Sequence, residues 1–134
     1  MYKTILVPID LSHPEPARKT LKIARAIGGA DARIALLHVL PETPPFVASE
    51  LPEGTLARNL ERALAELEAV GKDSGAEAEV RHGHAPTAIL EYAEEIGADL
   101  IIVGSHRPGF QDYFLGSTAS RVVRHAQCAV LVDR

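Results

Sequence analysis

The sequence has one cysteine and no tryptophan, and it lacks long hydrophobic runs and blocks of basic residues. A lone cysteine, Cys128, excludes an internal disulfide and any Cys-x-x-Cys metal or redox motif, and its apolar surroundings favour a small buried side chain. A net charge of -4 without a basic cluster argues against a nucleic-acid partner. The first apolar run ends at Pro8, too soon for a signal peptide or a membrane span. We therefore expect a cytoplasmic protein with no membrane or nucleic-acid partner.

Several familiar site motifs are also missing. There is no Gly-x4-Gly-Lys-Ser/Thr loop, and residues 8–16 (PIDLSHPEP) contain no glycine for a dinucleotide-binding turn. His82 and His84 have no third ligand at a standard spacing, so no metal site is expected. Ser12, His13 and Asp10 lie on one short loop, where they cannot line up as the nucleophile, base and orienting acid of a catalytic triad. A helix N-cap formed by Ser12 or Asp10 is the simpler interpretation.

The chain does contain a regular alternation of apolar runs and amphipathic segments. Runs rich in valine, isoleucine and leucine predict strands at 4–9, 33–40, 78–83, 99–105 and 128–133. Most are apolar throughout, which is typical of a parallel sheet covered on both faces. Helical periodicity predicts helices at 12–29, 54–75, 85–97 and 117–125. This order predicts a single doubly wound α/β domain, residues 1–134, with a five-stranded parallel sheet and helices on both faces.

In such a sheet, ligands bind beyond the carboxyl ends of the strands, near the point where strand order reverses. Asp10 follows the first strand and suits ribose hydroxyls or a metal ion, and Gly104 ends the fourth strand. Residues 116–118 (GST) open the last helix with free N–H groups and hydroxyls at the positive end of its dipole. The residues alone leave two interpretations open: a phosphate site, or a glycine turn followed by a Ser/Thr cap.

One connection, residues 41–54 (PETPPFVASELPEG), is unusually long and contains four prolines. Loops of this length often act as lids or binding loops. The alternative is a solvated connector that is held down by Phe46 and Val47.

Stretches spread over the entire chain resemble the universal stress protein family. They are ILVPIDLS (5–12), LLHVL (36–40), GHAPTAILEYAEEIGADLIIVGS (83–105) and LGSTASRVVRHAQCAVLV (115–132). The resemblance is strongest to the single-domain enterobacterial branch that is lettered F and G.

This resemblance implies an ATP site at the strand ends, as in one class of the family, and a homodimer formed through the last strand, residues 128–134. The ligand would be ATP, ADP or AMP, with or without Mg²⁺. Asp10 would face the ribose, and the backbone at Val39 would meet the adenine edge. The implied nucleotide-binding residues are Pro8, Ile9, Asp10, Val39, Val103, Gly104, Ser105, Arg107, Gly109, Gly116, Ser117 and Thr118.

The chain departs from the motif of the ATP-binding class, which is Gly, two residues, Gly, nine residues and then Gly-Ser or Gly-Thr. Gly104 matches the first glycine, but Arg107 replaces the second, and only eight residues separate it from Gly116. Either Arg107 turns inward as a charge-assisted phosphate ligand, or it points to solvent while Gly109 forms the tight turn. Because Asp10 and Gly116 are present, we expect nucleotide binding to be retained.

The expected function is that of a cytoplasmic, ATP-binding stress-response protein, a dimer or a larger assembly, that acts as a nucleotide-dependent switch or binds a client protein. No positioned base accompanies Arg107, so hydrolysis should be slow at most, and no catalytic residue is assigned. Two alternatives stay open. One is a nucleotide-free member of the family that binds a client, and the other is a slow nucleotide hydrolase using Arg107 and Asp10.

Overall fold

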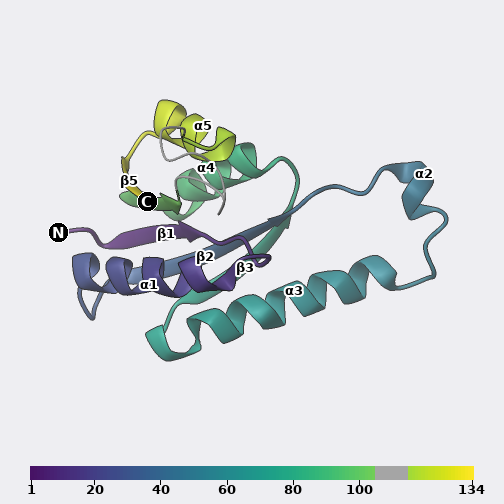
Figure 1. Ribbon diagram of the computed structural model, residues 1–134, viewed down its shortest axis with the longest axis horizontal. Helices are drawn as coiled ribbons and strands as arrows, with labels where there is room; N and C mark the ends of the chain where they lie inside the picture. Colours follow the sequence, from purple (N-terminus) through teal and green to yellow (C-terminus); the bar gives the residue numbers. More distant parts are fainter. Residues whose placement is uncertain (105–114) are drawn as a thin grey trace.

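A computed structural model of the protein describes residues 1–104 and 115–134, in which strands and helices alternate in the predicted order (Figure 1). The strands are β1 (Thr4–Pro8), β2 (Arg33–Leu40), β3 (Glu77–His82), β4 (Leu100–Gly104) and β5 (Ala129–Asp133). The helices are α1 (Pro14–Gly28), α2 (Pro45–Ala48), α3 (Thr55–Gly71), the 3-10 turn η1 (Lys72–Ser74), α4 (Ala85–Ile96) and α5 (Ser117–His125).

The five strands form one parallel sheet in the order β3-β2-β1-β4-β5, which confirms the predicted fold class. The chain moves from β1 outward to β3, then crosses back to β4 on the other side of β1. Strand order therefore reverses between β1 and β4, and the carboxyl ends of these two strands are where a doubly wound sheet places its ligand crevice.

Both faces of the sheet are covered. Helices α1 and α3 pack on one face, where Ile5 and Val7 of β1 point, and α4 and α5 pack on the other, where Leu6 points (Figure 1). All three side chains are fully buried. Because successive residues of a strand point to opposite faces, a sheet buried on both sides needs apolar residues at every position, which explains the continuous apolar runs.

The structure differs from the prediction mainly between β2 and β3. The proline-rich connection contains a short helix, α2, and Phe46 on it is 72% exposed, so the interpretation that Phe46 holds a connector down is wrong. The α-helix predicted to reach residue 75 ends at Gly71, and η1 carries the chain on to Gly75, whose φ of 68° closes the turn. Within residues 1–104 and 115–134, no helix is both long and apolar enough to cross a membrane.

Candidate functional site

A pocket of about 670 Å³ opens at the carboxyl ends of β1, β2 and β4, where strand order reverses. The structure brings nine of the predicted site residues together in its lining. They are Pro8, Ile9, Asp10, Val39, Val103, Gly104, Gly116, Ser117 and Thr118. The other three, Ser105, Arg107 and Gly109, lie outside the described residues. Side chains from distant parts of the sequence thus surround one space at the predicted edge of the sheet.

The turn after β1 is fixed by backbone hydrogen bonds. The Ile9 N–H donates to the Leu37 carbonyl at 2.8 Å, which extends the β1 to β2 pairing beyond the strand. The Asp10 Oδ1 atom accepts from the Ser12 N–H at 2.9 Å, and the Asp10 carbonyl accepts from the His13 N–H at 3.0 Å. Asp10 itself is exposed, and its Oδ2 atom makes no hydrogen bond to another described residue. One carboxylate oxygen is therefore available at the pocket rim.

The prediction that Ser12 or Asp10 caps the first helix is wrong. The N-cap of α1 is His13, and it makes no side-chain capping hydrogen bond. Two of the first three helical residues are prolines, Pro14 and Pro16. Because proline has no backbone N–H, this helix start presents few donors that a cap could satisfy.

The first backbone N–H groups of α5 donate to no other described residue. Gly116 is the N-cap residue, so no side chain is available at that position to accept a hydrogen bond, and the Ser/Thr cap of the alternative interpretation is not formed. Neither the Ser117 nor the Thr118 hydroxyl bonds to another described residue. The first N–H groups of a helix have no partner inside the helix, and they lie at the positive end of its dipole. Here they line a pocket, which is the arrangement that binds phosphate and other anions.

Sequence reasoning missed several lining residues. The Nδ1 atom of His38 lies 2.9 Å from the Ile9 carbonyl and links the ends of β1 and β2. Ile89 of α4 and Ala119 of α5 contribute buried apolar wall on the other side. The polar residue inside the LLHVL run was the available signal for His38, whereas nothing local marks Ile89 or Ala119 as pocket residues.

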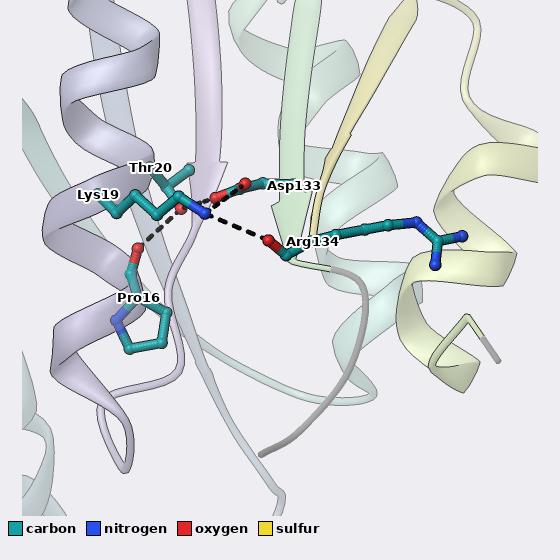
Figure 2. Close-up of polar contacts among 5 residues, drawn as sticks. All are labelled: Pro16, Lys19, Thr20, Asp133 and Arg134. Atoms are coloured by element: carbon teal, nitrogen blue, oxygen red, sulfur yellow. Dashed lines mark hydrogen bonds and ion pairs between the residues drawn. The ribbon is translucent and has the colours of Figure 1, made fainter. Parts of the chain in front are cut away.

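A polar network ties the end of β5 to α1 beside this pocket (Figure 2). The Lys19 ammonium lies 3.1 Å from Asp133 Oδ1 and donates to the Arg134 carbonyl at 3.2 Å. The Thr20 hydroxyl donates to the Pro16 carbonyl at 2.9 Å and lies 3.4 Å from Asp133 Oδ2. Thr20 lines the pocket, and Asp133 pairs in register with Gly104. The network therefore holds the outer strand in place next to a predicted phosphate-binding glycine.

We also considered the Cys128 thiol as a nucleophile and the described His, Cys, Asp and Glu residues as metal ligands. Burial raises the pKa of the Cys128 thiol, which keeps it protonated and agrees with a packing role for this half-buried side chain. In the described part of the chain, no three His, Cys, Asp or Glu residues are grouped so that they could hold a metal ion. What the site offers is a shaped pocket, one free carboxylate oxygen and a helix start with unpaired N–H donors.

These features define a doubly wound α/β protein with a pocket at its strand-order switch point. The family model described as "Universal stress protein family" matches residues 1–134, and the chain belongs to that family. Among named relatives, Universal stress protein G of Escherichia coli O157:H7 is 33% identical over 154 residues, covering all of both chains.

Solved structures agree with this assignment. The structure of hypothetical protein MJ0577 has a TM-score of 0.79 at 30% identity, covering 98% of this chain and 95% of that one. Universal stress protein UspA from Lactobacillus plantarum has a TM-score of 0.71 at 28% identity, covering 99% and 98%. Two more universal stress proteins share the fold at 21% identity, one from Archaeoglobus fulgidus in complex with dAMP (TM-score 0.67) and one in complex with cAMP (TM-score 0.70).

Proposed function

We propose that the protein binds an adenine nucleotide, ATP in the first instance, in the pocket at the carboxyl ends of β1, β2 and β4. The observation that carries the proposal is the start of α5, where unpaired backbone N–H groups line a pocket of about 670 Å³. The dAMP and cAMP complexes of two proteins with this fold support the adenine nucleotide as the ligand class.

The pocket suggests how the nucleotide would lie. The base would sit at the apolar end between Ile9 and Val39, and the free oxygen of Asp10 would accept a ribose hydroxyl. The phosphates would extend past Gly104 to the N–H groups at Ser117. Mg²⁺, if it accompanies ATP, would be held mainly by the phosphates, since Asp10 is the one acidic residue among the described lining residues.

We further propose that the protein is a cytoplasmic homodimer whose nucleotide state is read by a client protein. The outer strand β5 pairs with β4 on one side, and its Ala129 is exposed. An uncovered apolar edge strand favours pairing with a second copy, and a two-fold axis would cover both edges at once. The network of Lys19 and Asp133 connects this edge to the pocket wall at Thr20, a physical link between the dimer and the nucleotide.

Nucleotide binding is tested first on the protein as purified. Denaturing extraction followed by mass spectrometry should release AMP, ADP or ATP, and titration calorimetry on the stripped protein should show ATP binding. ATP should also raise the melting temperature, because a ligand that binds only the native state stabilises it. Absence of co-purified nucleotide together with no binding at high micromolar ATP would refute the proposal.

A matched pair of variants tests whether the Asp10 carboxylate contributes to ATP binding. Asp10→Asn should weaken ATP binding because the amide no longer offers a charged acceptor to the ribose. The control is Asp31→Asn. Asp31 is exposed in the turn before β2, at the opposite end of the sheet, so this variant should bind ATP like the wild type. Hydrolysis is expected to be slow, so turnover faster than about once per minute that is lost in Arg107→Ala would instead favour an enzyme.

A further inference from the structure

Two surfaces of the molecule expose large apolar side chains. The first is residues 41–61, here called the arm, which comprise α2 and the start of α3 and extend beyond the end of the sheet (Figure 1). On the arm, Phe46 is 72% exposed, Leu56 40% and Val47 37%. The second surface is α5, where Val123 is 45% exposed. Apart from Met1, these are all the exposed large apolar residues in the described part of the chain. Apolar groups that gather on two surfaces in this way mark candidate contact sites.

The two surfaces carry opposite charge. The arm contains four glutamates and a single arginine, and none of the glutamate side chains forms an ion pair with a described residue. Residues 115–127, which include α5, contain Arg121, Arg124 and His125 and no acidic residue. Neither arginine forms an ion pair or hydrogen bond with a described residue. Each surface therefore lacks the counter-charge that the other supplies.

The basic side chains on α5 surround a hollow. Its volume is about 380 Å³, and it is lined by Ser117, Ser120, Arg121, Arg124 and His125. Most of these positions are three or four residues apart, so they share one side of the helix, and Val123 lies three residues from Ser120 at the border of that side. The hollow thus combines hydroxyls and cations with an adjacent apolar group, which suits an apolar side chain flanked by carboxylates.

The arm cannot reach α5 of its own chain. Helix α3 packs on the face of the sheet that Leu36 and Val7 occupy, whereas α5 packs on the opposite face with Leu6. The arm also leaves from the β2 and β3 side of the sheet, and α5 covers the β5 side (Figure 1). Contact between these surfaces must therefore join two molecules.

We propose that the arm of one molecule docks on the α5 hollow of a second copy of this chain, with Phe46 as the apolar anchor and the arm glutamates, Glu50 and Glu53 foremost, facing Arg121 and Arg124. Complementary charge fixes the orientation of such a contact and excludes arm-to-arm pairing, in which carboxylates would face one another. The contact joins different surfaces of the two molecules, so it builds a ring or a chain, and it can link β5 dimers into larger assemblies.

The test is sedimentation velocity over a range of protein and salt concentrations. The wild-type protein should form larger species as its concentration rises, and salt should dissociate them because it screens exposed charges. The α5 variant Arg121→Glu with Arg124→Glu and the arm variant Glu50→Lys with Glu53→Lys should each lose these species. Phe46→Ser should lose them at every salt concentration, because it removes the apolar anchor.

Mixing the two charge variants gives the decisive result. In a mixture, reversed arms can meet reversed α5 surfaces, and association should return to the wild-type level. The control Glu91→Lys with Glu94→Lys makes the same charge change as the arm variant, on exposed residues of α4, and should associate like the wild type. Thermal melting checks that each variant is folded. The proposal is overturned by a wild-type mass that does not change with concentration or salt, or by a mixture that stays dissociated. It does not rest on nucleotide binding, so ATP titration of the same samples separates the two proposals.

Discussion

The two ends of the parallel strands use their polar groups differently. At the amino end, the Asp99 carboxylate accepts the Lys3 and Thr4 N–H groups at 2.8 and 3.0 Å. The Arg25 guanidinium near the end of α1 donates to the carbonyls of Gly29, Ala30 and Ala32. Side chains there satisfy backbone groups that the helix and strand ends leave unpaired, as helix termini require.

At the carboxyl end, side chains bond the turn after β1, but the start of α5 and the space beside Gly104 stay open among the described residues. No side chain caps α5, and no described atom lies within 4 Å of the Cβ position of Gly104. The strand ends and the start of α5 line a pocket there and do not pack directly on one another. In this protein, the amino end of the sheet is stabilised by closure, and the carboxyl end keeps donors that a ligand can use.

The sharpest test of this contrast adds one methyl group at each end of the sheet, at Gly28 and at Gly104, and compares the free energies of unfolding. A Cβ atom at Gly28 would lie 2.5 Å from Ala32 Cβ and 2.8 Å from Ile5 Cδ1, at the closed end. Gly28→Ala should therefore lower the free energy of unfolding by about 2 to 3 kcal/mol, as overpacking does. Gly104→Ala should change it by less than about 0.5 kcal/mol, because no described atom lies within 4 Å of the added methyl group. Urea denaturation measures both values, and equal losses would contradict the contrast.

The same Gly104→Ala variant sharpens the functional side of the comparison. Under the proposed function, its methyl group occupies space next to the phosphates, so ATP affinity should fall while stability is kept. Titration calorimetry measures the affinity. Unchanged ATP binding in this variant would place the phosphates elsewhere in the pocket.

Another prediction concerns the Asp99 carboxylate, which accepts backbone N–H groups at the amino end of the sheet. Asp99→Asn replaces one of two acceptor oxygens with an NH₂ group that faces a backbone N–H. The expected loss is about 1 to 2 kcal/mol, because hydrogen bonds to a charged acceptor are among the stronger ones. Asp31→Asn serves as the control, since it removes an equal charge from an exposed turn. A control loss as large as that of Asp99→Asn would mean that net charge and not hydrogen bonding is measured.

Acid should weaken the same end of the sheet. Burial raises the pKa of Asp99, but the hydrogen bonds from Lys3 and Thr4 outweigh it, and the pKa of this carboxyl is lowered in the folded protein. A lowered folded-state pKa means that the unfolded chain takes up the proton first. The stabilisation is then complete above the ordinary aspartate pKa of about 3.9 and is lost as the pH falls toward the folded value. Urea midpoints between about pH 5 and pH 3 should fall less steeply in Asp99→Asn than in the wild type.

Local pattern predicted most of the fold. Strand β2 has the predicted bounds because every residue of 34–37 is buried, and a run of apolar residues is what that burial requires. The sequence also predicted that Asp10, Gly104 and Gly116 would lie at one edge of the sheet, where they line the pocket, because each follows or precedes a strand or helix end that the sequence marks.

What escaped prediction depends on distant contacts. The apolar run predicts Asp99 only as the first residue of a strand, whereas its hydrogen bonds to Lys3 and Thr4 join parts of the chain 96 and 95 residues apart. Asp133 and Lys19 likewise meet across the sheet edge. Helix α2 was missed because proline clusters indicate a loop, although proline is also favoured at the first turn of a helix.

The last comparison takes one ion pair from each end, and the smallest predicted effect belongs to the exposed pair. At the amino end, the Arg33 Nε atom lies 2.6 Å from Glu77 Oε2, and the two side chains are 43% and 54% exposed. At the carboxyl end, Asp133 is only 14% exposed beside Lys19. Arg33→Gln should cost less than about 1 kcal/mol, and high salt should abolish the loss, because exposed pairs are weak and screened. Lys19→Gln should cost more and keep its effect in salt, because it leaves a largely buried carboxylate without its cation. If high salt erased both losses alike, the Asp133 carboxylate would have to be as well solvated as that of Glu77.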